Sequence, residues 1–230
     1  MEGVKQHFEE EAREFDQVIV ALIPDYGHMV EALVVALPFD SRASIKIIDL
    51  GCGTGTVALS ILRAFPNAHF TCLDLAENVI AMARTKLAGY AHVRYLVGDF
   101  NIFNGEYDAV VSSLALHHFL TDDAKRRFYR RIYDSLRPGG VFYNADVVLA
   151  SSERLQETYM SHWRDFMRRS VSEQEIENKW IPKYYAEDHP VKLNDQLQWL
   201  AEIGFADVEV VWKQYNFAVY GGAKPPETFR

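Results

Sequence analysis

Residues 47–59, IIDLGCGTGTVAL, join an apolar strand, a loop of alternating glycines and the start of a helix. Gly51, Gly53 and Gly55 permit positive φ angles and let the backbone approach a ligand closely, while the first N–H groups of the helix remain unpaired. Thr56 stands where the dinucleotide-binding pattern G-x-G-x-x-G needs its third glycine. The loop therefore predicts a bound nucleoside, without deciding between nicotinamide cofactors and others.

Around this loop, short apolar runs alternate with helical patterns, as in a parallel sheet with crossover helices. The expected strands span residues 45–50, 68–75, 92–99, 107–116 and, after a Pro-Gly-Gly turn, 141–149. A last helix, capped by Asn194 or Asp195, and an antiparallel pair of strands follow. We therefore expect an α/β fold with a mostly parallel, seven-stranded sheet, helices on both faces and an antiparallel last strand.

Segments on either side of this core complete a single domain. Phe8, Ala12 and Phe15 lie on one stripe of an amphipathic helical pattern near the N-terminus. The stretch after the fifth strand carries aromatic-rich helical patterns and no convincing strand, which indicates a helical lid insertion. We expect one domain over residues 1–224, built from N-terminal helices (1–44), the core (45–149), the helical lid (150–192) and the last helix with its strand pair (193–224), ahead of a disordered tail (225–230).

The composition is that of one soluble globular domain, since 49% of the 230 residues are apolar and the formal net charge is −8. This acidic balance repels a phosphate backbone, and the densest basic stretch, residues 125–131, has the spacing of a solvated helix face, so nucleic-acid partners are not expected. No run approaches the roughly 18 to 20 apolar residues of a membrane span, and the acidic N-terminus is unlike a signal peptide. We expect a cytoplasmic protein without membrane contact, and we leave a homodimer open.

Two carboxylates follow the next two strands. Asp74 lies 23 residues after Gly51 (74 − 51), where a carboxylate can accept both hydroxyls of a ribose; the alternative role is to cap the following helix. Asp99 belongs to the sequence Gly98-Asp99-Phe100, in which the carboxylate suits the amino group of adenine and the aromatic ring suits the face of the base. An ordinary turn is the alternative for Asp99.

These residues, in this order, resemble the class I S-adenosylmethionine-dependent methyltransferases. The resemblance covers residues 45–148 and rests on DLGCGTG (49–55), Asp74, GDF (98–100), YDAVVSSLALHHF (107–119) and LRPGGVF (136–142). It implies a Rossmann-like methyltransferase fold, S-adenosyl-L-methionine as the cofactor and S-adenosyl-L-homocysteine as the product. A nicotinamide-dependent dehydrogenase would explain neither the antiparallel ending nor the GDF sequence.

Nearly the whole chain is also similar to the carboxy-S-adenosylmethionine synthases and to methyltransferases related to them. The similar segments are IPDY (23–26), the acidic aromatic insertion, QWLAEIGF (198–205) and VWKQYNFAVYGGAK (211–224). Trp199 stands where those synthases have the arginine that pairs with the extra carboxylate of their product, and tryptophan cannot make that charge-assisted contact. The similarity therefore favours plain methyl transfer over carboxylation of the cofactor.

The similarity also implies which residues bind the cofactor. Tyr26 would contact it, Gly51 would hold its methionine part, and Ser113 takes the place of an asparagine. Asp49 is expected to lie beneath the glycine loop as an acceptor for backbone N–H groups or for the amino group of the cofactor. The full predicted set is Tyr26, Asp49, Gly51, Gly53, Asp74, Leu75, Asp99, Phe100 and Ser113.

Methyl transfer from a sulfonium is an in-line displacement, so the protein has to hold the nucleophile, the methyl carbon and the sulfur in line. A base is needed only where the acceptor must lose a proton. His117 and His118 after the fourth strand, and Asp146 within the fifth, are the candidate catalytic residues. For the histidines the alternative is packing against the next helix, and for Asp146 it is bonding to backbone N–H groups.

Cysteines and histidines show no ligand spacing, which predicts no metal site.

Aromatic residues of the expected lid and last helix are candidates for contact with the acceptor or the sulfonium, although an inserted hairpin also needs a core of its own. They are Tyr159, Trp163, Tyr184, Tyr185 and Trp199. We expect an enzyme that methylates a small-molecule acceptor. The alternatives are an enzyme that modifies the cofactor itself and a nucleoside-binding module without turnover.

Overall fold

The structure is a computed structural model and describes residues 15–227. Phe8 and Ala12 of the expected N-terminal stripe lie outside this range, as do residues 228–230 of the expected tail, whereas residues 225–227 are exposed and form no helix or strand. Among the described residues no single helix is long and apolar enough to cross a membrane, and only the pair Asp16–Leu22 and Tyr26–Val35, bent by 99°, reaches that length when joined.

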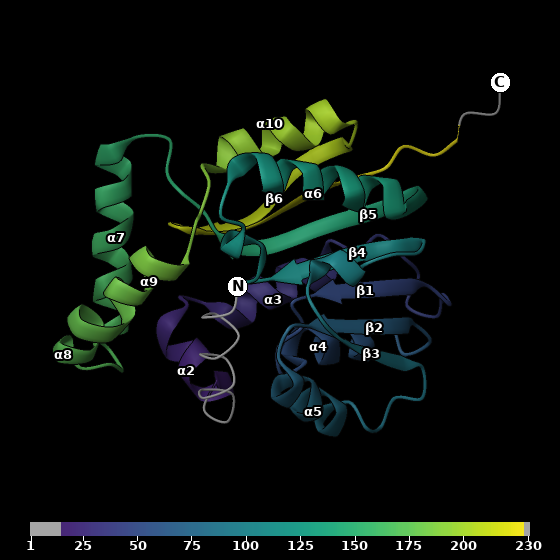
Figure 1. The fold of residues 1–230 in the computed structure, drawn as a ribbon, viewed down its shortest axis with the longest axis horizontal. Helices are drawn as coiled ribbons and strands as arrows, with labels where there is room; N and C mark the ends of the chain where they lie inside the picture. Colours follow the sequence, from purple (N-terminus) through teal and green to yellow (C-terminus); the bar gives the residue numbers. More distant parts are fainter. Residues whose placement is uncertain (1–14, 228–230) are drawn as a thin grey trace.

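One sheet of seven strands runs through the molecule in the order β3-β2-β1-β4-β5-β7-β6 (Figure 1). The pairs from β3 to β5 are parallel, while β7 is antiparallel to both β5 and β6. The strands are β1 (Lys46–Leu50), β2 (His69–Asp74), β3 (Val93–Val97), β4 (Tyr107–Ser113), β5 (Leu136–Val147), β6 (Ala206–Gln214) and β7 (Phe217–Ala223). The predicted fold class is confirmed.

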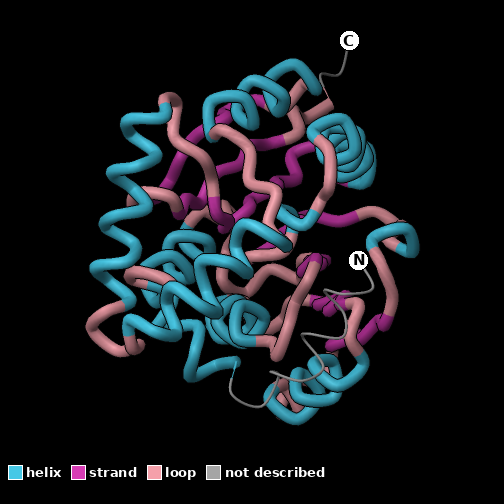
Figure 2. The backbone as a smooth tube through the Cα atoms, turned by 60° about the vertical axis from the view of Figure 1, so that its left-hand side comes forward, coloured by secondary structure: helices cyan, strands magenta, loops and turns pink. Residues whose placement is uncertain are grey.

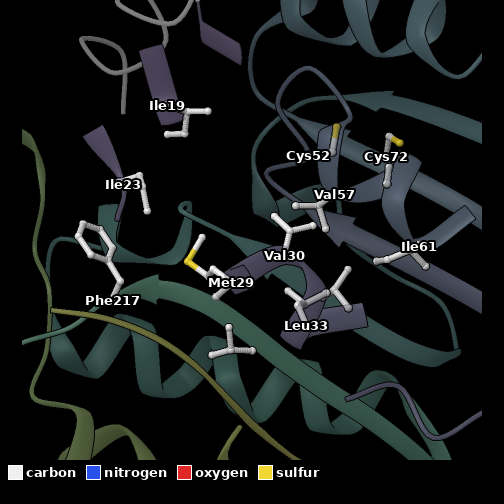
Figure 3. Packing of buried hydrophobic residues seen from close by; sticks show 14 of the residues in the cluster. Ile19, Ile23, Met29, Val30, Leu33, Cys52, Val57, Ile61, Cys72 and Phe217 are labelled. Carbon is white, nitrogen blue, oxygen red and sulfur yellow. The ribbon is translucent and has the colours of Figure 1, made fainter. Parts of the chain in front are cut away.

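Both faces of the sheet are covered because its strands are apolar on both sides. On one face Ile47 packs with α2 (Phe15–Leu22), α3 (Tyr26–Val35) and α4 (Thr56–Ala64); Figure 3 shows their side chains meeting there. Helix α5 (Glu77–Lys86) also contacts this half of the sheet. On the other face Ile48 and Leu50 pack with α6 (Asp122–Ser135) and α10 (Leu193–Ile203).

The segment after β5 forms a helical unit beyond one end of the sheet, seen at the left of Figure 1 and brought forward in Figure 2. It consists of α7 (Glu153–Met167), α8 (Glu173–Glu175), η3 (Ile176–Trp180) and α9 (Ile181–Glu187). Trp163 of α7 donates a hydrogen bond from Nε1 to the carbonyl of Leu22 at 2.7 Å, which joins this unit to α2. We call α7 to α9 the lid.

Several strand ends differ from those expected by one to three residues, as where β4 ends at Ser113 rather than at residue 116, and two differences are larger or concern a cap. Strand β5 begins at Leu136 rather than at residue 141, because Leu136 already pairs with Tyr107 and the Pro-Gly-Gly sequence forms an irregularity within the strand instead of a turn before it. The N-cap residue of helix α10 is Lys192, and its side chain makes no capping hydrogen bond. Neither Asn194 nor Asp195 therefore caps this helix. The short helices η1 (Phe100–Ile102) and η2 (Leu116–His118) follow β3 and β4.

Candidate active site

The glycine loop closes tightly because the chain after β4 passes directly against it. Gly51 has φ +76°, and a Cβ atom there would lie only 2.3 Å from the Cβ of Ala115. Gly53 has φ +52° but open space around it. Leu114, next to Ala115, holds φ +50°, an unusual angle for a residue with a side chain and typical of functional sites.

A cavity of about 910 Å³, open solvent at its mouth included, lies between this loop and the carboxyl ends of β1, β2, β3 and β4. We call it the glycine-loop cavity. All the predicted cofactor-binding residues line it: Tyr26, Asp49, Gly51, Gly53, Asp74, Leu75, Asp99, Phe100 and Ser113. Further residues line it that were not predicted to bind the cofactor, namely Cys52, Thr54, Thr56, Val57, Ala76, Gly98, Leu114, Ala115 and the catalytic candidate His118. Thr54 and Thr56 could have been found, because they lie within the glycine motif.

Asp74 and Asp99 both line this cavity and accept backbone N–H groups, but only Asp99 has the role that was its alternative, because the N-cap of α5 is Ala76 and not Asp74. Asp74 accepts the N–H of Gly53 at 2.8 Å and that of Ala76 at 3.1 Å. Asp99 accepts the backbone N–H of Asn101 at 2.7 Å and caps η1. Burial raises the pKa of Asp74, although these backbone N–H groups counteract it. Each carboxylate retains lone pairs for a ligand in addition to its backbone bonds.

Asp49 is fully buried, and neither of its carboxylate oxygens has a hydrogen-bond partner among the described residues. The expected bonds to backbone N–H groups are therefore not formed. Burial, together with the negative charge of Asp74, raises the pKa of Asp49 to about 8. An unpaired buried carboxylate is costly, so this group suits a donor supplied by a ligand.

An ion-pair network holds α2 against the glycine loop. Lys86 of α5 donates to Asp16 at 2.6 Å and to the hydroxyls of Thr54 and Thr56 at 2.9 and 2.8 Å. Hydrogen bonds to Lys86 and the two threonine hydroxyls outweigh burial and lower the pKa of Asp16. Helix α2 is thereby fixed beside the glycine-loop cavity.

A second cavity, of about 1030 Å³ with open solvent included, lies between α2, the lid and the chain after β4. We call it the aromatic cavity, because Trp163, Trp180, Tyr184 and Phe217 line it. Trp163 is packed edge-on against Tyr184 and Phe217, with ring centroids 5.3 and 5.8 Å apart. Leu114 and His118 line both cavities, so the two spaces adjoin at these residues.

Three of the aromatic residues predicted to contact the acceptor lie elsewhere. Tyr159 packs against Tyr215, which directly follows β6, and takes a hydrogen bond from Lys213. Tyr185 is 66% exposed and packs edge-on against its buried neighbour Tyr184, with ring centroids 5.1 Å apart, but it does not line the aromatic cavity. Trp199 packs with the α6–α10 cluster on the opposite face of the sheet and lines neither cavity.

His117 is buried between two carboxylates. Its Nδ1 lies 2.5 Å from Asp146 Oδ1, and its Nε2 lies 3.4 Å from Asp188 Oδ1. Burial alone would lower the pKa of His117, but Asp146 and then Asp188 raise it to about 10. Burial and the neighbouring His117 lower the pKa of His118 to about 4. Sequence reasoning missed Asp188, because it comes from the lid, far along the chain.

A buried polar network fixes Asp146. This carboxylate also accepts the N–H of Val147 at 2.9 Å and the side-chain amide of Asn144 at 3.1 Å. Asn144 donates to the hydroxyl of Tyr220, which reaches Gln196 of α10. Asp146 thus bonds a backbone N–H group, which was its alternative role, and it also orients His117, a contact that the sequence did not predict.

Comparisons with known proteins agree with this architecture. Residues 47–140 match a family model described as a methyltransferase domain. The carboxy-S-adenosyl-L-methionine synthase of Nautilia profundicola is 26% identical over 221 residues, which are 92% of this chain and 91% of that protein. An O-methyltransferase family protein from Burkholderia thailandensis aligns with a TM-score of 0.67 and 19% identity over 96% of this chain and 63% of its own.

Human N-acetylserotonin methyltransferase, solved in complex with S-adenosylmethionine, aligns with a TM-score of 0.58 and 18% identity over 86% of this chain and 52% of its own. The chain therefore spans less than two thirds of either solved protein. The methyltransferase-domain match covers the strands that build the glycine-loop cavity, so residues 47–140 form a methyltransferase domain, and the similarity to the carboxy-S-adenosyl-L-methionine synthases extends over nearly the whole chain. The cofactor of this chain is S-adenosyl-L-methionine, and curated relatives that span nearly all of it carry the name carboxy-S-adenosyl-L-methionine synthase.

Proposed function

We propose that this enzyme transfers the methyl group of S-adenosylmethionine to a small-molecule acceptor held in the aromatic cavity. The observation that carries the proposal is the meeting of the two cavities at Leu114 and His118. A cofactor in one and an acceptor in the other would face each other across this boundary. The aromatic walls favour an acceptor with an apolar, planar body, and the lid leaves a space of small-molecule size.

In this proposal the cofactor is held by the residues at the carboxyl ends of the strands. Asp74 accepts the ribose hydroxyls, Asp99 accepts the adenine amino group, and the backbone at Gly51 holds the methionine part. S-adenosylmethionine supplies the methyl carbon, to which the acceptor's electron pair bonds as the carbon–sulfur bond breaks and its pair stays on sulfur. The remaining task of the protein is to align the acceptor and exclude water.

The direct test is a screen for methyl transfer from isotopically labelled S-adenosylmethionine to phenols, carboxylic acids and amines with apolar bodies. We expect label in at least one of these classes, together with S-adenosylhomocysteine. Tight cofactor binding without turnover on any acceptor would instead favour a nucleoside-binding module.

Asp49 gives cofactor binding a distinctive pH dependence. Because its pKa is about 8 without a ligand, Asp49 is mostly protonated near neutral pH, and the cationic cofactor favours the ionised form. Binding should release a proton, so affinity for S-adenosylmethionine should rise up to about tenfold from pH 6.5 to pH 7.5. Isothermal titration in buffers of different ionisation enthalpy measures both effects. Asp49→Asn should bind more weakly at pH 7.5 and lose this slope; an unchanged slope would show that another group titrates.

The aromatic cavity can be tested separately from the cofactor. Trp180 lines it and is only partly buried, so Trp180→Ala should leave the protein folded. We expect the KM of an acceptor found in the screen to rise about tenfold, since a large apolar contact is lost, while the Kd for S-adenosylmethionine stays within threefold. Tyr185→Ala, an exposed lid residue outside the cavity, is the matched control. Equal effects of both changes on KM would contradict this assignment.

The second candidate is modification of the cofactor itself, which the names of the curated relatives support. The sequence suggested that Trp199 argues against this second candidate. In the structure position 199 lies away from both cavities, so Trp199 carries no argument against it. What favours methyl transfer is that, among the described residues lining either cavity, none is an arginine for a bidentate contact with an extra carboxylate; Lys179 and Lys183 of the aromatic cavity offer positive charge only as single ammonium groups. Mass spectrometry of the ligand that copurifies separates the two candidates, because only the second predicts a carboxylated sulfonium.

A further inference from the structure

Two neighbouring histidines meet a carboxylate from the lid at the boundary between the cavities. His117 and His118 belong to η2, and Asp188 directly follows α9. Potential ligand atoms of these side chains all lie within 4.8 Å of one another, and Asp188 Oδ1 is 3.4 Å from His117 Nε2 and 3.8 Å from His118 Nδ1. The two segments are tied together by the backbone, because the N–H of His189 donates to the carbonyl of His117 at 2.8 Å.

From this juxtaposition we infer that His117, His118 and Asp188 bind one divalent transition-metal ion. Two imidazoles and one carboxylate suit ions such as Zn²⁺, Fe²⁺ and Co²⁺, and three protein ligands leave a coordination position open. Bonds of about 2.0–2.2 Å to one ion place tetrahedral ligand atoms about 3.4 Å apart. The 3.4 Å between His117 and Asp188 already has this spacing, whereas His118 Nδ1, 3.8 Å from Asp188, would exchange its 3.2 Å contact with the carbonyl oxygen of Glu187 for the ion.

The surroundings of His117 orient its ring as a ligand. Its Nδ1 is engaged by Asp146 at 2.5 Å, which leaves Nε2 facing Asp188. Asp146 is itself held by the N–H of Val147 and the amide of Asn144, and so it cannot turn away without breaking these bonds. A carboxylate behind a histidine in this way fixes the ring and its tautomer and strengthens the bond from the other nitrogen to a metal.

The ion would enter a cluster of buried charges. Asp146 is fully buried and Asp188 is 19% exposed, so two carboxylates stand on either side of one imidazole ring. In the metal-free protein a proton on His117 and the buried ammonium group of Lys125, whose charge acts on Asp146, compensate these charges, whereas a divalent ion would take the place of the proton at Nε2 of His117. The alternative is a cluster that holds a proton on His117 and binds no metal ion. The two alternatives are distinguished by measuring whether the protein binds a divalent ion.

The site would place the ion where the proposed acceptor meets the methyl group, because His117 and His118 line the aromatic cavity and His118 also lines the glycine-loop cavity. An acceptor oxygen on the open position would lose its proton more readily, which makes it a better nucleophile. This use of the ion rests on the proposed function, but its binding does not.

The test is titration of the metal-free full-length protein with Co²⁺, followed by its visible absorption, and with Zn²⁺ by calorimetry. We expect one ion per chain, with Asp188→Asn and His118→Gln each weakening binding at least tenfold. Glu187→Gln, a change at a neighbouring residue that lines the same cavity, should stay within threefold of the wild type. No stoichiometric binding by the wild type, or equal affinity in Asp188→Asn, would overturn the inference.

Two further measurements keep the interpretation clear. Thermal unfolding of each variant shows that it is folded, and Asp188→Asn should bind S-adenosylmethionine as the wild type does, because Asp188 lines only the aromatic cavity. If Co²⁺ binds and is lost in Asp188→Asn, the metal site stands even where no acceptor is methylated. Failure of the proposed function is thereby distinguished from failure of the inference.

Discussion

Asp74→Ala should weaken binding of S-adenosylmethionine about 100-fold. Asp74 ends β2 at the glycine-loop cavity, where its carboxylate is expected to accept both ribose hydroxyls. Hydrogen bonds to a charged group contribute about 1.5–3 kcal/mol each, so loss of two predicts a decrease of two orders of magnitude or more. The carboxylate also holds the N–H of Gly53, so the loop that surrounds the ligand loses a support at the same time.

Calorimetry with S-adenosylmethionine and S-adenosylhomocysteine measures this loss. Asp108→Ala is a suitable control, because Asp108 also accepts a backbone N–H, that of Lys46, but lies near the opposite, amino end of β4. The affinity of Asp108→Ala for S-adenosylmethionine should match that of the wild type. Asp74→Asn keeps one acceptor oxygen, so its affinity should fall between that of the wild type and that of Asp74→Ala. A folded Asp74→Ala protein that binds within threefold of the wild type would show that the ribose lies elsewhere.

Gly221→Ala should cost about 4 kcal/mol or more of the free energy of unfolding, at the upper end of single substitutions. Gly221 lies in β7, where it is paired with Tyr143 of β5 and Glu209 of β6. A Cβ atom there would stand 1.9 Å from the carbonyl oxygen of Phe142, which is backbone and has no room to move. The antiparallel strand that closes the sheet would have to shift.

Thermal and urea unfolding of this variant measure the effect, and we expect Tm to fall by about 10 °C or more. Gly89→Ala is the matched control, since no atom lies within 4 Å of a Cβ at that position and Gly89 does not have a positive φ. It should unfold like the wild type or slightly later. Equal stability of Gly221→Ala would mean that β7 tolerates displacement from β5.

The core of the fold could be predicted because its signals are local. Apolar runs such as residues 45–50 are long enough to be strands, and the glycine loop marks the end of the first one. Parallel strands bring their carboxyl ends to one edge, so Asp49, Asp74 and Asp99 reach the same cavity although they are far apart in sequence. The roles of these residues in holding the cofactor stay predictions.

The aromatic cavity could not be predicted in the same way. Whether an aromatic residue of a helix faces a ligand or another helix depends on how the helix is docked, and Trp163 and Trp199 are indistinguishable by type. The cluster at η2 was missed for a related reason. His117 and His118 are adjacent, but the carboxylate beside them, Asp188, arrives only through the packing of the lid.

The small size of the boundary at Leu114 and His118 has a consequence for redesign. Because the cavities share only these two lining residues, the remaining aromatic walls belong to one ligand alone. Substitutions at Trp180 and at Asp74 should then combine additively in free energy, as expected for sites without shared partners. New acceptors could be selected by varying the lid, with the affinity for the methyl donor left as it is.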